Sequence, residues 1–302
     1  MVPRTLAWVL ALLGGIASLA AQDGASTTTS SGSRPRITLL GASITDGFTD
    51  PGSQDWRGQR NETLPLKRAL AALWPDGAVE IRNRASMMLF ADTENLGERQ
   101  IRLAQRDGSA FLVALDFAFW FGYGAFGHGE EAKARRLALQ DKGLDLLSRI
   151  SAPMLVGDYP DMTGADPRML SRQQIPDAGT LAELNRRLQA WAKGRPNVRI
   201  FPMSDLVATV KKSGEKVVLG GKEVVIPPER LLQGDRLHAT RLGMATLTAR
   251  LLPALRDLLP ESHPLRPKEM GQEQILDALG VLGDVQATQP SRPASRPQPA
   301  GR

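Results

Sequence analysis

Short apolar runs alternate with longer amphipathic stretches through most of the chain. Five short runs, bounded by turn residues, are candidate strands: residues 37–40, 79–83, 117–121, 154–157 and 198–201. Apolar residues recur at helical spacing between and after them, over residues 64–73, 94–105, 130–150, 181–193 and 240–259. Since such alternation is typical of βαβ units, the pattern predicts an α/β fold with a mainly parallel, five-stranded sheet.

One further element interrupts this alternation. Residues 216–227 alternate apolar and polar positions on either side of Gly220-Gly221. Two adjacent glycines between such runs favour a tight turn, so the segment is expected to form a small hairpin insertion.

The first 20 residues have the pattern of a secretory signal peptide. Arg4 precedes an apolar run over residues 6–16, and Ser18-Leu19-Ala20 has the small-x-small form of a cleavage site. The pattern predicts a secreted or periplasmic protein that begins near Ala21 and has no stable membrane insertion once the leader is cleaved. The alternative is a leader that is retained as a membrane anchor.

Two polar segments flank the predicted domain. Residues 21–35 are rich in Ser, Thr and Gly and are expected to be a flexible linker, whereas residues 284–302 repeat Pro and Arg and are expected to be a disordered tail. The folded domain is therefore predicted over residues 36–283. Its length suits a single α/β core.

Composition narrows the possible functions. Hydrophobic residues make up 42% and charged residues 23% of the 302 positions, as in ordinary soluble domains. The formal net charge is +6, but Arg4 lies in the leader and Arg292, Arg296 and Arg302 lie in the tail, so nucleic-acid binding gains little support. The chain has no cysteine, which excludes disulfides, thiolate metal sites and a thiol nucleophile.

Ser43 is the first candidate for chemistry. It follows the first predicted strand in the sequence GASIT at residues 41–45. The carboxyl edge of a parallel sheet is where open α/β folds bind their ligands, and Gly41 and Gly47 permit a tight turn there. Because serine is also common in ordinary turns, a purely structural role is the alternative.

Asp235 and His238 form the second candidate. They stand three residues apart, just before the last predicted helix, and the chain has only two other histidines, His128 and His263. At this spacing a carboxylate can bind one imidazole nitrogen and leave the other facing a serine hydroxyl. The alternative is a helix-capping Asp235 beside a surface histidine.

These two segments together resemble the SGNH or GDSL family of serine esterases and lipases. GASIT is similar to the family's first block, Gly-Asp-Ser-Leu, and DRLH at 235–238 is similar to its last block, Asp-x-x-His. The resemblance covers about residues 36–260. It implies a flavodoxin-like three-layer α/β/α sandwich in which Ser43 is the nucleophile, His238 the general base and Asp235 its orienting partner, with no metal or organic cofactor.

The middle blocks depart from the family pattern. In place of the second-block glycine, whose N–H helps to bind the oxyanion, the nearest residues are Ala91 and Ala85. At the expected place of the third block, usually Gly-x-Asn-Asp, the chain has FGYGAFGHG, which keeps Gly122 but has Gly124 where the asparagine would stand. His128 in that segment is a candidate replacement donor, and a solvent-exposed loop histidine is the alternative. The residue before the serine, usually Asp, is Ala42.

The sequence therefore predicts a serine hydrolase that cleaves an acyl ester of a small molecule or a carbohydrate, with a carbohydrate acetyl ester as one candidate. Loss of one oxyanion donor typically costs about 10² to 10³ in rate, so the altered blocks would weaken catalysis without abolishing it. Two alternatives remain open: a non-catalytic ligand-binding domain that kept the triad, and an O-acyltransferase in which a hydroxyl replaces water.

Overall fold

A parallel sheet forms the centre of the protein, whose computed structural model describes residues 34–52, 54, 58 and 62–287. Its order is β2-β1-β3-β4-β5, and every neighbouring pair is parallel. This is the doubly wound order of flavodoxin-like folds, so the predicted α/β class and five-stranded parallel sheet are confirmed. The strands are β1 (Arg36–Leu39), β2 (Glu80–Asn83), β3 (Phe111–Ala114), β4 (Met154–Gly157) and β5 (Val198–Phe201).

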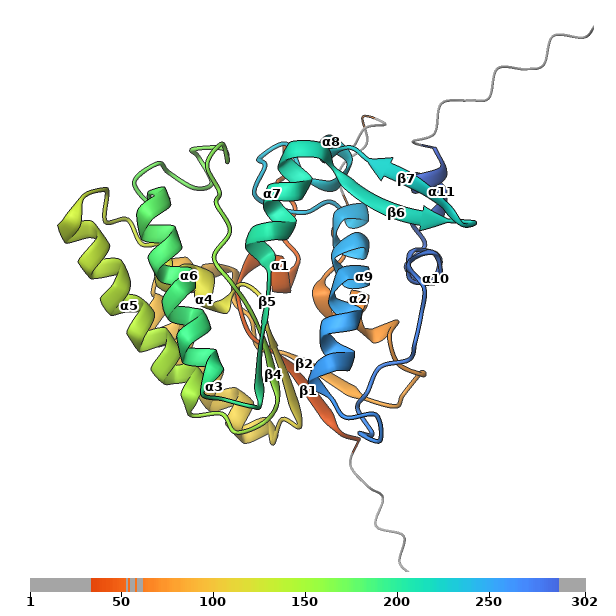
Figure 1. The fold of residues 1–302 in the computed structure, drawn as a ribbon, viewed down its shortest axis with the longest axis horizontal. Coiled ribbons are helices and arrows are strands. Elements are labelled where there is room, and N and C mark those ends of the chain that lie inside the picture. Colours follow the sequence, from red (N-terminus) through yellow and green to blue (C-terminus); the bar gives the residue numbers. More distant parts are fainter. Residues whose placement is uncertain (1–33, 53, 55–57, 59–61, 288–302) are drawn as a thin grey trace, which may run out of the picture. The chain divides into compact units, whose positions relative to one another are not determined.

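Helices cover both faces of this sheet and make the three layers (Figure 1). The alternation of side chains along each strand explains the two cores: in β3, Phe111 and Val113 join one buried cluster, whereas Leu112 and Ala114 join the other. The helices are α1 (Ser43–Asp46), α2 (Leu66–Ala71), α3 (Thr93–Asp107), α4 (Phe117–Gly122), α5 (Glu130–Ser148), α6 (Ala178–Lys193), α7 (Met203–Ser213), α8 (Pro228–Leu231), α9 (Arg241–Leu258), α10 (Gln272–Ala278) and α11 (Leu282–Gln286), with the 3₁₀ turn η1 (Met87–Phe90).

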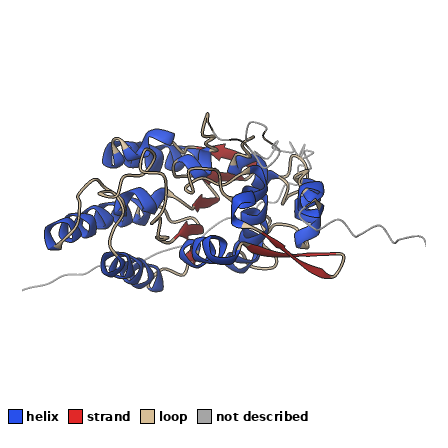
Figure 2. Ribbon diagram, turned by 90° about the horizontal axis from the view of Figure 1, so that it is seen from above, coloured by secondary structure: helices blue, strands red, loops and turns tan. Residues whose placement is uncertain are grey.

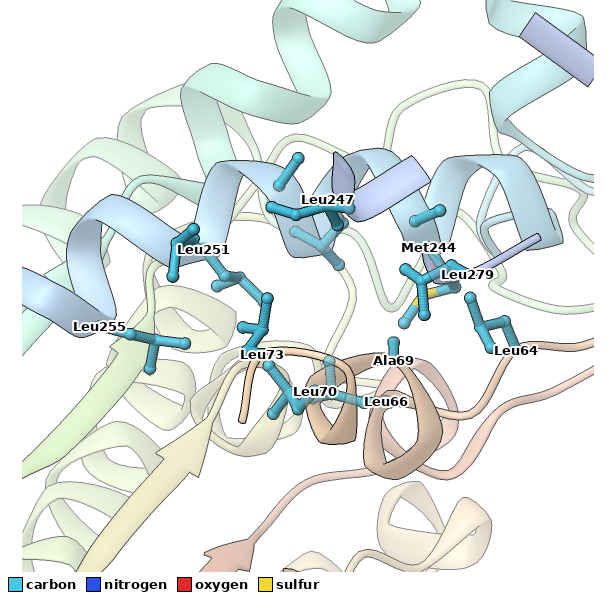
Figure 3. Close-up of a cluster of buried hydrophobic side chains, with 14 of the residues drawn as sticks. Leu64, Leu66, Ala69, Leu70, Leu73, Met244, Leu247, Leu251, Leu255 and Leu279 are labelled. Atoms are coloured by element: carbon cyan, nitrogen blue, oxygen red, sulfur yellow. The ribbon is translucent and has the colours of Figure 1, made fainter. Parts of the chain in front are cut away.

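The buried cluster that contains Phe111 and Val113 also contains the facing side chains of α2 and α9. Figure 3 shows Leu70 and Leu73 pointing toward Leu251 and Leu255, while Leu279, from the segment after α10, lies beside Met244. The C-terminal helices thus complete the core that covers one face of the sheet.

The predicted third strand is wrong. Residues 117–121 lie in helix α4, and the strand is β3, six residues earlier. Residues 111–121 read FLVALDFAFWF, an apolar run interrupted only by Asp116. A run of this kind fits either a buried strand or a buried helix, and here the strand ends just before Asp116 and the helix begins just after it.

The other elements agree with their predicted positions. Strands β1, β2, β4 and β5, the five predicted helices and the hairpin all form, and the hairpin pairs β6 (Glu215–Leu219) with β7 (Lys222–Ile226). Figure 2 shows the hairpin lying apart from the five-stranded sheet. Helices α7, α8, α10 and α11 were not predicted, and α11 extends three residues beyond the predicted domain end at 283. The predicted signal peptide lies outside the described residues, as do most of the linker and tail.

Candidate active site

Ser43, His238 and Asp235 form a continuous hydrogen-bonded chain at the carboxyl edge of the sheet. The Oγ of Ser43 lies 2.9 Å from Nε2 of His238, and Nδ1 of His238 lies 2.7 Å from Oδ2 of Asp235. Asp235 and His238 are both buried, at 1% and 4% exposure. Both lie at least 192 positions after Ser43 in the sequence. The fold therefore brings together the three residues that the two motifs had singled out.

The turn at residues 235–238 fixes the orientation of the imidazole. Asp235 accepts hydrogen bonds at Oδ1 from the backbone N–H groups of Leu237 and His238, at 2.9 and 3.0 Å. Arg236 has the left-handed φ of 53° that closes this turn, an uncommon conformation for a residue other than glycine. Burial by itself would raise the pKa of Asp235, but the hydrogen bonds from His238 and the backbone outweigh it and hold that pKa below its ordinary value. Asp235 is thus held as a carboxylate.

Gln233 and Phe48 hold the histidine segment against the serine segment. The Nε2 group of Gln233 donates to the carbonyls of Phe48 and Ala239, while its Oε1 accepts from the Asp50 N–H. The Phe48 ring packs against the His238 imidazole with 4.3 Å between ring centroids. These contacts limit how far His238 can move from Ser43.

The serine turn requires glycine at position 41. Gly41 has a φ of 143°, and a Cβ there would overlap a carboxylate oxygen of Asp116. Gln100 on α3 binds this residue twice: the Gly41 N–H donates to Oε1 at 2.8 Å, and Nε2 donates to the Gly41 carbonyl at 2.9 Å. Ser43 is therefore positioned by a turn that is itself held from α3.

Asp116, just after β3, binds the first turn of α1. Its Oδ2 accepts from the Ile44 N–H at 2.9 Å, and its Oδ1 accepts from the Thr45 hydroxyl at 2.6 Å. Burial raises the pKa of Asp116 above its ordinary value, although these hydrogen bonds act in the opposite direction. A buried carboxyl group therefore lies directly behind the candidate nucleophile.

The expected oxyanion donors of the second block are already engaged. The Ala85 N–H donates to Oδ1 of Asn83 at 3.0 Å, and the Ala91 N–H donates to the Met88 carbonyl at 2.9 Å. The Ser43 N–H, at the start of α1, has no hydrogen-bond partner within the part of the chain that the structure describes. Of these three backbone groups, that of Ser43 is the one left to bind an oxyanion.

The expected third-block residues lie away from Ser43. The carbonyls of Gly122 and Gly124 accept hydrogen bonds from Nη1 of the buried Arg136, both at 2.9 Å, and His128 is exposed in the following loop. None of these three residues lines the cavity that opens at Ser43. The misplaced third strand explains the error, because the residue at the actual strand exit is Asp116.

Three positioning residues were missed from the sequence: Gln100, Asp116 and Gln233. Each binds backbone groups that lie far away in the sequence, so no local motif marks Gln100 or Gln233. Asp116 did carry a signal, since it is the one charged residue in an eleven-residue apolar run.

The described part of the chain contains neither a cluster of potential metal ligands nor a helix that could span a membrane. No three His, Asp or Glu side chains there gather into a group that could hold a metal ion. No helix among the same residues is long and apolar enough to cross a bilayer.

Comparisons with known proteins give only distant likenesses. No protein-family profile and no curated protein matches the chain by sequence. Among solved structures, a gut microbial diltiazem-metabolizing enzyme matches with a TM-score of 0.47 and 12% identity over 73% of this chain and 46% of that one, so the chain spans less than half of that enzyme.

Two further structures cover more of their own length. An acetylxylan esterase from Geobacillus stearothermophilus, solved as a catalytic mutant, has a TM-score of 0.42 and 12% identity over 72% of this chain and 93% of that one. A protein described as a GDSL-like lipase, from Parabacteroides merdae, has a TM-score of 0.39 and 15% identity over 82% and 96%. Since these TM-scores lie below 0.5, the functional argument rests on the site itself.

Proposed function

We propose that the protein is a serine hydrolase that cleaves a carboxylic ester through an acyl-enzyme. The observation that carries this proposal is the chain of hydrogen bonds from Ser43 through His238 to Asp235, with distances of 2.9 and 2.7 Å. A serine hydroxyl is a weak nucleophile until a neighbouring base accepts its proton, and His238 is in place to do so.

In the first half of the reaction, Oγ of Ser43 attacks the acyl carbon and its proton passes to Nε2 of His238. The Ser43 N–H contributes to binding the oxyanion. The bond from the acyl carbon to the alcohol oxygen then breaks, and His238 returns the proton to the departing alcohol. In the second half, water attacks the acyl-enzyme and His238 accepts a proton from it. The bond from the acyl carbon to Oγ of Ser43 then breaks, His238 returns the proton to Oγ, and the acid leaves.

Steady-state kinetics on 4-nitrophenyl butyrate tests this assignment. Ser43→Ala and His238→Ala should lower kcat to nearly the same floor, and the double variant should fall little further, because the two residues act in one proton transfer. Asp235→Ala should cost about 10² to 10⁴ in kcat. Circular dichroism checks that each variant is folded. Losses at Ser43 and His238 that multiply in the double variant would contradict a shared step.

A non-catalytic binding domain is the second candidate function. The observation that favours it is the engagement of the Ala85 and Ala91 N–H groups within their own turns, which leaves few donors for an oxyanion. A folded wild-type protein with no turnover above that of Ser43→Ala would favour this candidate.

A further inference from the structure

An apolar cavity, partly open to solvent, begins at Ser43. Its walls come from the strand exits, from α4 and from α7, and most of the lining side chains are hydrocarbon or thioether. They include Leu115, Phe119, Trp120, Met162 and Val207. A group attached to the carbon that Ser43 attacks would enter this space.

A second apolar cavity adjoins the first. The two share Ile44, Met203, Val207, Leu232 and Leu237 among their lining residues, so they meet beside the residue that follows Ser43. Farther along, the second cavity is lined by residues such as Val210 of α7 and Leu247 of α9. Together they form an apolar passage that leads from Ser43 toward the space between these two helices.

The polar side chains in this passage are already bound by the protein. Asp116 accepts from α1, as described above, and Asp158 at the exit of β4 accepts from the N–H and the hydroxyl of Ser204, both at 2.6 Å. Burial also raises the pKa of both carboxyl groups, against the effect of their hydrogen bonds. A sugar or a charged group in the passage would lose its hydrogen bonds to water without gaining equivalent hydrogen bonds from the protein.

The passage lies on the acyl side of the reaction. The departing alcohol must receive its proton from Nε2 of His238, so it leaves toward the imidazole. His238 and Asp235 line neither cavity, whereas Ser43 lines the first and Ile44 lines both. The part of the substrate that enters the passage is therefore the part that remains attached to Ser43 after the alcohol leaves.

The rim beside the first cavity is apolar as well. The ring of Phe90 packs 5.4 Å from that of Trp120, centroid to centroid, and Phe90 is 49% exposed. Met87 and Met88 of the same turn are 45% and 55% exposed. Exposed side chains of this size beside a cleft favour contact with an apolar ligand.

We propose that this passage binds an unbranched apolar acyl chain, so that the substrate is an ester of a medium-chain fatty acid rather than an acetyl ester. The inference rests on the proposed function, because it uses Ser43 as the attacking residue. Val207 lines both cavities and stands where they meet.

The test is the dependence of kcat/KM on acyl length, measured with the full chain on 4-nitrophenyl acetate, butyrate, hexanoate and octanoate. Each methylene buried in the passage should raise kcat/KM by about three- to fourfold until the passage is filled. Octanoate should therefore be hydrolysed far more efficiently than acetate. A maximum at acetate would overturn the acyl-chain proposal and leave the hydrolase proposal intact.

A matched pair of substitutions locates the effect. Val207→Phe should lower the ratio of kcat/KM for octanoate to that for acetate by at least about tenfold, because the ring blocks the junction. Val225→Phe makes the same change on the hairpin, where Val225 is 49% exposed, and should leave the ratio unchanged. If Val207→Phe and Val225→Phe gave the same ratio of kcat/KM for octanoate to that for acetate, the acyl chain would not bind in this passage.

Covalent labelling of the wild-type protein provides a second measurement that does not depend on the folding of a variant. In an alkyl fluorophosphonate, Oγ of Ser43 bonds to phosphorus and fluoride leaves, while His238 accepts the serine proton. An octyl reagent should label Ser43 at least about tenfold faster than an ethyl reagent. Equal rates would overturn the acyl-chain proposal alone, whereas no labelling by either reagent would overturn both proposals.

Discussion

A carboxyl group supports the nucleophile turn, although the residue before Ser43 is Ala42. The family pattern places an aspartate directly before the serine, where this chain has Ala42. Asp116, at the exit of the neighbouring strand β3, instead binds the Ile44 N–H and the Thr45 hydroxyl of α1. The start of α1 therefore has a carboxyl partner despite Ala42.

The pKa of Asp116 leads to a pH-dependent prediction for Asp116→Asn. Since burial raises this pKa above the ordinary 3.8, the folded protein binds the proton more tightly than the unfolded chain does. As pH rises from about 4 to about 7.5, the wild type should thus lose unfolding free energy relative to the Asn variant. Urea unfolding of both proteins across this range measures the difference, and a difference that stays constant or moves in the opposite direction contradicts the raised pKa.

The residues found from the sequence are those that a local sequence pattern marks. Asp235 and His238 are three residues apart, and Ser43 lies beside a strand exit, so local patterns marked them. Gln100 binds Gly41 across 59 residues, and Gln233 binds the Phe48 carbonyl across 185. Contacts of this kind exist only once the layers have assembled, and a single sequence does not reveal them.

Among the elements, the third strand shows where periodicity fails. Strands β4 and β5 are short runs with clear turn residues around them, and their predicted limits agree with the structure. Residues 111–121 contain a buried strand and the start of a buried helix, and only Leu115 and Asp116 separate the two. The apolar pattern alone does not separate the two elements, and placing the strand in the second half also places the expected oxyanion residues in the wrong loop.

That loop has a structural role that can be tested at Arg136 on α5. The Arg136 guanidinium donates to the carbonyls of five residues, at the end of α4 and in two loops: Gly122, Gly124, Gly127, Gln173 and Gln174. Arg136→Met should lower the unfolding free energy by about 2 to 5 kcal/mol, because several buried carbonyls lose their donor together. Denaturant unfolding measures this loss. The adjacent Arg135 is exposed and pairs with Glu131, so Arg135→Met should change stability little, and equal effects of both substitutions would contradict the assigned role.

At the scale of the whole molecule, the C-terminal helices belong to the same core as the sheet. Leu276 of α10 is fully buried within the cluster that includes α2 and α9, and the N–H of Val218 on the hairpin donates to Gln272 of α10. The sequence prediction ended the domain near this region but did not identify these helices, since they are short and their apolar residues face a core built from distant segments.

Substitution of Leu276 tests this integration. Leu276→Ala should lower the unfolding free energy by about 2 to 5 kcal/mol, as is usual for a leucine removed from a packed core. The whole unfolding transition should shift without splitting into two. Asp277→Ala, at the exposed neighbouring position, is the control and should have little effect. A separate early transition in the Leu276 variant would show that α10 unfolds independently of the sheet.

The central claim is that Ser43 is a nucleophile activated by His238. Incubation of the full chain with a fluorophosphonate probe, followed by mass spectrometry of its peptides, tests this claim most directly. The site geometry predicts a single phosphonylated peptide, modified at Ser43, and strongly reduced labelling in His238→Ala because the serine proton then has no acceptor. A folded wild-type protein that stays unlabelled under conditions in which a known serine esterase reacts, or that is labelled at a different serine, would contradict the claim.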